Sequence, residues 1–336
     1  MLNTIDLHCD TMPAMLGMTQ KGKHPAIEKN DLQIDLTKLE KGEFMLQCFS
    51  TYTNLEEVKS RGKKPFEHVM ELAAFWHMQI EAHPDRIRQV RTYQDIKRNS
   101  EKGIISALMT VEEGGVYEGK IDNLHRLFDE GARMSTLTWN FENELAFPNP
   151  TVPVGDARIP DMENGLKPWG YIFIEEMQTL GMIIDLAHLN DAGIKNVLDT
   201  VKVPVISSHS NCRSLCSHLR NLTDENIRRI AEGGGVIGVN FYPAFLRDDS
   251  YDPESGRQRA SVKDMVRHMQ HMKQVGGIEC VALGSDHDGY DGLSEIRTAS
   301  DFGILADAMS AGGFTSSEIE KIFYQNALRV MKDVLK

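Results

Sequence analysis

The sequence lacks the features that would tie the chain to a membrane or to nucleic acid. Its 336 residues contain no uninterrupted apolar stretch near the ~18 residues that a membrane span needs, and the N-terminus has no secretion-signal pattern. Basic residues are outnumbered: Lys+Arg 37 against Asp+Glu 49 gives a net charge of −12, which leaves no basic surface to neutralise phosphates. We therefore expect a cytoplasmic protein that binds neither a membrane nor nucleic acid.

Cysteine is scarce as well. The five cysteines, an odd number, are scattered through a chain too long to depend on disulfide bonds, so reduced thiols are expected. Cys212 and Cys216 are four residues apart, but no second pair accompanies them. This spacing does not indicate a zinc finger.

Eight short apolar runs have the length of buried strands, and stretches with helical spacing lie between them. Alternation of strands and helices predicts a parallel sheet, and runs that are apolar almost throughout are typical of strands covered on both faces. The sequence therefore predicts an α/β fold, a TIM-like (β/α)8 barrel of the metal-dependent hydrolase type. The expected strands are Thr4–Asp10, Phe44–Ser50, Ile104–Glu112, Met134–Trp139, Met182–Leu186, Val203–Ser208, Val236–Phe241 and Val281–Ser285, and the expected helices include Phe66–Ala82, Ile121–Asp129, Trp169–Leu180, Asp191–Thr200, Thr223–Glu232 and Ser261–Val275.

No repeat, low-complexity tract or Pro/Gly-rich linker divides the chain, which predicts a single domain over residues 1–336. The polar stretch at about 142–167 carries Pro148, Pro150, Pro153 and Pro160. We interpret it as a βα loop over the mouth of the barrel, because long loops in compact domains usually serve the functional site.

Ionisable residues stand at the ends of five of the apolar runs. One acidic residue after a strand would mean little, because caps and turns use Asp routinely. In a barrel, however, the carboxyl ends of the strands meet at the face where active sites lie. The pattern therefore predicts a metal site built from His8 and Asp10, which an alternation of two places on one strand face, and from Glu112, His188, His209 and Asp286.

Imidazole and carboxylate ligands suit Zn²⁺. Two ions about 3.5 to 4 Å apart would share Glu112 and hold a hydroxide between them, which is the design of a hydrolase. Glu113 directly follows Glu112 and is an alternative bridge, and each His taken alone is more often structural. We interpret Asp286 as the general acid/base.

Arg220 lies eleven residues beyond His209. Arginine binds carboxylates through two parallel hydrogen bonds, so Arg220 is a candidate for fixing the carboxyl end of a small substrate. The alternative is an ordinary surface arginine. The segment Gly284 to Gly289 resembles part of a Ca²⁺ loop, but the rest of an EF-hand pattern is missing.

Taken in order and spacing, these motifs resemble the membrane (renal) dipeptidase family, a zinc branch of the amidohydrolase-type barrels. The resemblance covers almost the whole chain and is to a soluble, microbial member, since the secretion signal and the lipid-anchor tail of the renal type are not recognised here. It rests on Asp6, His8 and Asp10, on Val111-Glu112, on Asp185 and His188, on Ser208-His209-Ser210, on Arg220-Asn221, on Val239 to Tyr242, and on Gly284, Asp286, Asp288 and Gly289.

The resemblance implies two Zn²⁺ per chain that share Glu112, which a gapless alignment of Gly131 favours over Glu113. It also implies that Arg220 grips the substrate carboxylate, that Asp286 serves the bridging water and the leaving amine, and that the chain forms a homodimer. Trp139 and Tyr242 are expected to contact the substrate. The implied ligands are His8, Asp10 and Glu112 for one ion, and Glu112, His188 and His209 for the other.

One departure from the family concerns the stretch Thr138-Trp139-Asn140, where some members, including the renal type, carry a substrate-facing His. Without that His, the metal ions are expected to be the main stabilisers of the oxyanion. We thus predict a zinc-dependent dipeptidase that hydrolyses short peptides, chiefly dipeptides, through a metal-bridged hydroxide. The alternatives are an amidohydrolase acting on N-acyl amino acids or other small amides and a metal-binding protein without activity.

Overall fold

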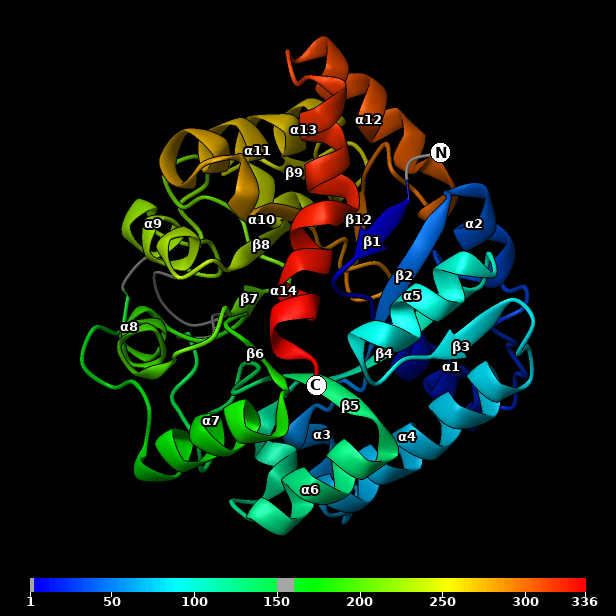
Figure 1. Cartoon of the computed structure of the whole chain (residues 1–336), viewed down its shortest axis with the longest axis vertical. Helices are drawn as coiled ribbons and strands as arrows, with labels where there is room; N and C mark the ends of the chain where they lie inside the picture. Colours follow the sequence, from blue (N-terminus) through cyan, green and yellow to red (C-terminus); the bar gives the residue numbers. More distant parts are fainter. Residues whose placement is uncertain (1–2, 150–159) are drawn as a thin grey trace.

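Eight parallel strands form a nearly closed barrel in the computed structural model, which describes residues 3–149 and 160–336 (Figure 1). The strands follow one another in chain order around the barrel, and the backbone N–H of Leu7 donates to the carbonyl of Leu283 at 2.9 Å where the last strand meets the first. The predicted TIM-like fold is confirmed. The strands are β1 (Thr4–Asp6), β2 (Phe44–Ser50), β4 (Ile105–Val111), β5 (Ala132–Thr136), β6 (Ile183–Asp185), β7 (Ile206–Ser207), β8 (Val236–Val239) and β11 (Val281–Leu283).

Helices surround the barrel (Figure 1). Their ends follow local signals in the sequence: α4 and α7 begin with a proline, while Thr92 with Asp95 and Ser261 with Asp264 form capping boxes at α5 and α11. No described helix is long and apolar enough to cross a membrane. The helices are α1 (Thr11–Gln20), α2 (Leu36–Lys41), α3 (Leu55–Ser60), α4 (Pro65–Glu81), α5 (Tyr93–Glu101), α6 (Ile121–Glu130), α7 (Pro168–Leu180), α8 (Asp191–Thr200), α9 (Asp224–Glu232), α10 (Pro243–Leu246), α11 (Val262–Gly276), α12 (Phe302–Ala311), α13 (Ser316–Glu320) and α14 (Asn326–Val334).

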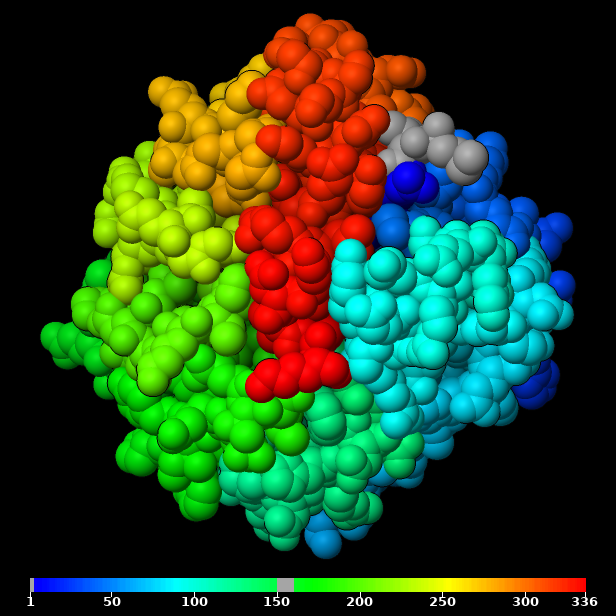
Figure 2. All heavy atoms as spheres, in the orientation of Figure 1, coloured from blue at the N-terminus to red at the C-terminus, as the bar shows by residue number. Residues whose placement is uncertain are grey.

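The C-terminal helix α14 covers the end of the barrel at which the strands begin, and it lies across the centre of the face in Figure 2. The strands contribute to two apolar clusters, an inner one inside the barrel and an outer one under the surrounding helices. Neighbouring residues of a strand point to opposite faces, so Ile183 belongs to the inner cluster and Ile184 to the outer one. The inner cluster includes Ile5, Leu46, Met134, Ile183, Ile206, Val236 and Ala282 from the strands and Ala327, Val330, Met331 and Val334 from α14.

The structure corrects the predicted strand boundaries. Most strands are shorter than expected. The continuous strand β1 ends at Asp6 instead of Asp10, because beyond it only an isolated bridge between Cys9 and His287 continues the pairing before α1 begins at Thr11. Four short strands were not predicted because they carry too few buried apolar residues to show a period. They are β3 (Ile87–Gln89), which pairs with β4, and β9 (Tyr251–Asp252), β10 (Arg257–Arg259) and β12 (Gly292–Leu293), which form a separate small sheet.

The predicted loop at about 142–167 falls between β5 and α7. Pro150 and Pro153 lie outside the described residues. In the described part, Asn149 donates its backbone N–H to the carbonyl of His188 at 3.1 Å and its side-chain amide to the carbonyl of Leu189 at 3.1 Å. This part of the loop therefore lies against the segment that follows β6.

Candidate metal centre

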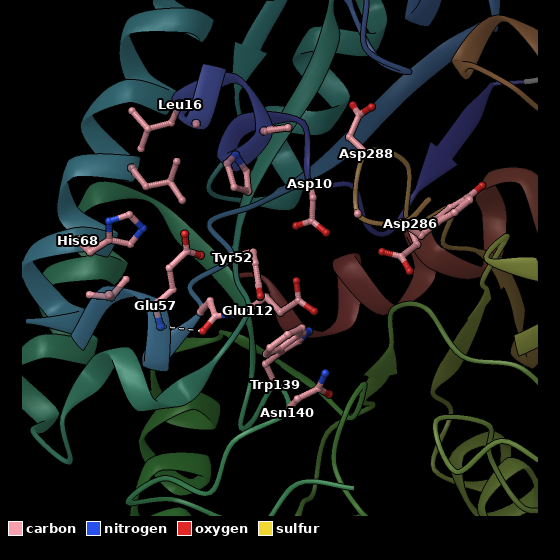
Figure 3. A pocket seen from close by; sticks show the side chains of 18 of the residues that line it. Asp10, Leu16, Tyr52, Glu57, His68, Glu112, Trp139, Asn140, Asp286 and Asp288 are labelled. Atoms are coloured by element: carbon pink, nitrogen blue, oxygen red, sulfur yellow. Dashed lines mark hydrogen bonds between the residues drawn. The ribbon is translucent and has the colours of Figure 1, made fainter. Parts of the chain in front are cut away.

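Six buried ionisable side chains come together where the barrel strands end. They form three overlapping groups, and within each group the possible ligand atoms lie within 4.8 Å of one another. Each of the six residues is at most 9% exposed. Figure 3 shows three of them, Asp10, Glu112 and Asp286, pointing into a common space. The groups are His8, Asp10 and Glu112; Glu112, His188 and His209; and His8, His209 and Asp286.

Glu112 faces both sides of this cluster. Its Oε2 atom lies 3.3 Å from Nε2 of His8, which is itself 3.5 Å from Oδ2 of Asp10. Its Oε1 atom lies 2.8 Å from Nε2 of His188 and 3.6 Å from Nε2 of His209. One carboxylate thus stands between two sets of candidate ligands.

Glu113 points into the neighbouring loop. Its carboxylate accepts hydrogen bonds from the backbone N–H of Gly115 at 2.6 Å and of Trp139 at 2.9 Å, and from the side-chain amide of Asn143 at 2.5 Å. Burial raises the pKa of Glu113 to about 7 despite these donors. Of the two adjacent glutamates, only Glu112 belongs to the cluster.

The hydrogen bonds of the histidines leave their Nε2 atoms turned toward the cluster. Nδ1 of His188 lies 3.0 Å from Oδ1 of Asn140, and Nδ1 of His209 lies 2.8 Å from Oγ of Ser208. With Oδ1 of Asn140 as acceptor, a neutral His188 ring carries its proton on Nδ1, so the lone pair on Nε2 faces the Glu112 carboxylate. Such an arrangement is repulsive unless a cation lies between the two groups, and partners of this kind commonly orient metal-binding histidines.

Two further atoms support the fit of a metal. Nε2 of His8 and Oδ1 of Asp10 are buried, and neither makes a hydrogen bond, although two carboxylate oxygens lie 3.3 Å and 3.5 Å from Nε2 of His8. Buried polar atoms are normally paired, and unpaired ones in a native structure call for an explanation. The donor set of imidazole nitrogens and carboxylate oxygens matches what Zn²⁺ binds in proteins.

The electrostatics hold three of the candidate ligands in metal-binding protonation states. Burial lowers the pKa of His188 to about 3, and burial together with the charge of His8 holds the pKa of His209 well below its usual value. Burial opposes ionisation of Glu112, but His8 and His188 outweigh it and hold the pKa of Glu112 well below its usual range. Metal binding requires neutral imidazole and ionised carboxylate, and these shifts favour both at His188, His209 and Glu112. His8 differs: burial lowers its pKa, but the carboxylates of Glu112 and Asp10 outweigh burial and hold that pKa well above its usual value.

Two buried aspartates of the motifs hold the segments that carry the ligands. Asp6 accepts hydrogen bonds from the backbone N–H of Ser285 at 2.7 Å and from its hydroxyl at 2.6 Å, which fixes the residue before Asp286. Asp185 accepts from the backbone N–H of Ser208 at 2.9 Å, next to His209. Both aspartates therefore act on the positions of the cluster residues without entering it.

Backbone strain is also concentrated here. His188 has a φ of 68° and Asp286 a φ of 61°, in the left-handed region that residues with a side chain seldom occupy. Such strain persists only where the surrounding structure imposes it, and it clusters at functional sites.

A cavity of about 790 Å³ opens over the cluster. Trp139 and Tyr242, the residues expected to contact a substrate, both line it, as do Asp10, Glu112, His188 and Asp286. Burial raises the pKa of Asp286 to about 7, against the attraction of His8.

Arg220 is buried, so it is not the surface arginine of the alternative interpretation. Its Nη2 donates to the carbonyl of His209 at 3.1 Å, and its guanidinium lies 5.5 Å from the ring centre of Phe245. Its Nε has no hydrogen-bond partner. Arg220 therefore stands directly behind the candidate ligand His209 with an unused donor, although it is not one of the side chains that line the cavity.

Three residues at the site carry no charge at neutral pH and were missed from the sequence. Tyr52 follows β2, lines the cavity and packs edge-on against Trp139, with ring centres 4.9 Å apart. Asn140 contacts His188, and the side-chain amide of Asn240 donates to Oδ2 of Asp286 at 2.9 Å. Asn240 belongs to the motif Val239 to Tyr242 and Asn140 to the stretch Thr138-Trp139-Asn140, so both had a signal in the sequence, whereas Tyr52 had none.

The cysteines take no part in the cluster. All five are buried and free, as expected. The thiol of Cys212 donates to the carbonyl of His268 at 3.5 Å and that of Cys216 to the carbonyl of Ala244 at 3.3 Å.

Comparison with known proteins identifies the family. The family model for membrane dipeptidase, peptidase family M19, matches residues 1–336. The chain belongs to this family. Membership of M19 makes it a hydrolase of peptide bonds and implies that it uses a metal.

Two sequence relatives of this M19 chain are themselves uncharacterized. A protein in the pqqA 5′ region of Klebsiella pneumoniae is 32% identical over 252 residues, which cover 74% of this chain and 89% of that protein. An uncharacterized dipeptidase of Schizosaccharomyces pombe is 34% identical over 234 residues, or 68% of this chain and 53% of the yeast protein. The match thus spans about half the length of the yeast protein.

Solved structures share the fold over nearly the full length of the chain. The dipeptidase AC, a metallo peptidase of family M19, superposes with a TM-score of 0.86 at 23% identity and covers 99% of this chain and 98% of its own. A metallo peptidase from Rhodobacter sphaeroides, solved with a phosphinate mimic of the dipeptide L-Ala-D-Ala, gives a TM-score of 0.85 at 22% identity and covers 98% and 99%.

Proposed function

We propose that this M19 member is a zinc-dependent dipeptidase whose two metal ions share Glu112. The observation that carries the proposal is the position of that carboxylate: one oxygen faces His8 and the other faces His188 and His209. A shared carboxylate at the base of a cavity is the arrangement used by two-metal hydrolases.

In this proposal His8, Asp10 and Glu112 hold one zinc ion, and Glu112, His188 and His209 hold the other. Zinc bound there supplies a Lewis acid that polarises the peptide carbonyl and activates the attacking water. Asp6 and Asp185 keep the ligand segments in place through their backbone hydrogen bonds.

Asp286 is the proton carrier of the proposed reaction. Its carboxylate takes a proton from the attacking water and delivers it to the nitrogen of the departing amine. The dipeptide is thereby split into its two amino acids. Asn240 donates to Oδ2 and thereby leaves Oδ1 directed toward His8, at 3.9 Å from its Nε2. That orientation points the free oxygen into the cluster.

Arg220 is the proposed anchor for the substrate carboxylate. Its buried Nε has no hydrogen-bond partner in the protein, which supports this role although Arg220 does not line the cavity. A buried guanidinium binds a carboxylate more strongly than an exposed one does. Trp139 and Tyr52 supply an aromatic wall in place of the substrate-facing His that some family members carry.

The test is turnover of a dipeptide panel by zinc-loaded protein, followed by mass spectrometry, with N-acetylated versions of the same peptides in the same reaction. The panel includes L-Ala-D-Ala, whose mimic the Rhodobacter relative binds. Cleavage of the free dipeptides alone is expected. Cleavage of the blocked set would instead assign the chain to hydrolases of N-acyl amino acids, and no cleavage of either set would contradict the proposal.

A further inference from the structure

The cavity continues beyond the metal cluster, into a groove between α1 on one side and α3 and α4 on the other. Figure 3 shows Leu16, Glu57 and His68 on the side of the cavity away from Asp286. Small or apolar side chains that are buried or half-buried form the walls of the groove, and polar side chains, most of them exposed, form its rim. The walls consist of Pro13, Ala14, Leu16, Gly17, Val58 and Leu72, and the rim of Gln20, Lys21, Glu57, Arg61 and His68.

The groove is long for a dipeptidase. Helix α1 begins directly after Asp10 and forms one wall as far as Gln20, which at 1.5 Å per residue places the outer rim about 15 Å from Asp10. Two residues of extended peptide span only about 7 Å. The two-residue backbone of a dipeptide therefore leaves room in this groove for a large side chain.

Gly17 keeps the middle of the groove open. A Cβ atom built on Gly17 would meet no other atom within 4 Å, although the residue is half-buried in the middle of a helix. The neighbouring walls offer apolar surface from Leu16, Val58 and Leu72. At the rim, Glu57 and Arg61 already form an ion pair with each other, so this pair does not require a charged ligand.

The topology indicates which part of a substrate would enter the groove. Arg220 follows β7, whereas the groove lies beyond β1 and β2. In the order of the eight barrel strands, β2 and β7 are four places apart and therefore lie on opposite sides of the mouth. With its carboxylate at Arg220 and its peptide bond at the cluster, a dipeptide would direct its amino-terminal residue toward α1.

We infer that the groove along α1 receives the side chain of the amino-terminal residue of the dipeptide and selects apolar side chains of the size of Leu, Met or Phe. This inference rests on the proposed dipeptidase function. An apolar pocket discriminates side chains by about tenfold or more for each methylene group that it buries.

The first experiment compares kcat/KM of the zinc-loaded enzyme for Leu-Ala, Phe-Ala, Ala-Ala and Ala-Leu. Leu-Ala and Phe-Ala are expected to exceed Ala-Ala by about tenfold or more. The second experiment introduces Gly17→Leu, which fills the groove from a helical position where leucine is favoured over glycine. The ratio of kcat/KM for Leu-Ala to that for Ala-Ala should fall by about tenfold.

Gly303→Leu is the matched control. Gly303 lies in α12, its added Cβ would also meet no atom within 4 Å, and it does not line the cavity. This variant should keep the wild-type ratio, and the melting temperatures of both variants check that they fold.

Two results would overturn the groove inference while leaving the dipeptidase function intact: wild-type enzyme that cleaves Ala-Ala at least as well as Leu-Ala, or a Gly17→Leu variant whose Leu-Ala to Ala-Ala ratio is unchanged. The wild-type comparison decides the matter even if Gly17→Leu fails to fold. Failure to cleave any dipeptide would remove the proposed function itself, and the inference with it.

Discussion

The two ends of the barrel are built from the same strands but differ in almost every physical property. At the end where the strands begin, Ile5 and its neighbours pack against Met331 of α14 in an apolar cluster. At the other end, His8 and Glu112 bring buried polar atoms together, and some of these atoms have no partner in the protein. The first end stabilises the fold, and the second gives up stability to hold the cluster side chains close together.

This division explains why a chain can bury several carboxylates side by side. Burying an unpaired charge costs several kcal/mol, and a protein tolerates it only where another group or a bound cation compensates. The apolar end supplies the stability that the cluster lacks. Substitutions at the two ends should therefore affect different properties. Those at the cluster should lower activity, and those at the apolar end should lower stability.

The largest expected effect is on activity at the cluster end. Glu112→Gln removes the shared carboxylate charge, so turnover of dipeptides should fall on the order of a thousandfold or more, with loss of bound zinc. Activity assays and metal analysis by mass spectrometry measure the two losses. Glu113→Gln is the control, because the carboxylate of Glu113 accepts hydrogen bonds from the neighbouring loop and is not part of the cluster. This variant is expected to retain its zinc. The reverse pattern would make Glu113 the bridge.

Asp286→Asn separates proton transfer from metal binding at the same end. Loss of the carboxylate should lower kcat by about 100- to 10,000-fold, the usual contribution of general acid/base catalysis, while zinc stays bound. The zinc content and kcat of the purified variant are measured together. Retained activity would remove Asp286 from the mechanism.

At the opposite end, Met331→Ala should destabilise the protein by about 3 kcal/mol, because Met331 is fully buried and a cavity would remain. Urea unfolding measures the free energy of unfolding. The kcat of the folded variant should stay at the wild-type value. A loss of kcat without a loss of stability would show that the two ends are coupled.

The smallest effect is expected from Asn140→Ala, which removes the acceptor that orients the His188 ring. Residues of this kind typically contribute about 10- to 100-fold to metal affinity. Competition with a zinc chelator measures that affinity. Asn164→Ala is a control on the same βα segment, because Asn164 is exposed and, within the part of the chain that the structure describes, its hydrogen bonds go to Asp161 and Asn190. Equal zinc affinity of the two variants would argue against the orienting role.

The sequence predicts the barrel well because buried parallel strands must be apolar, and such runs are visible without a structure. The residues of the cluster could be predicted for a related reason: each ionisable residue interrupts or ends an apolar run. Neutral residues such as Tyr52 and Asn140 give no such contrast. Short polar strands such as β10 were missed because they have too few buried apolar residues to show a period.

Other features depend on three-dimensional packing and could not be derived from spacing. Glu112 and Glu113 are adjacent in sequence, and only the direction of each side chain distinguishes them. The burial of Arg220 and the open space at Gly17 likewise depend on elements far apart in the chain. A sequence pattern predicts where a residue lies along a helix or strand. It does not predict the cavities that form where several helices and strands pack together.

The central claim is that the carboxyl ends of the strands hold two metal ions that share Glu112. The most direct test is a zinc titration of metal-free wild-type protein by isothermal calorimetry, with bound zinc counted by mass spectrometry after dialysis. Two zinc ions per chain, together with dipeptidase activity that appears on zinc addition, are the predicted result. One zinc ion or none per chain in a folded and active enzyme would contradict the account.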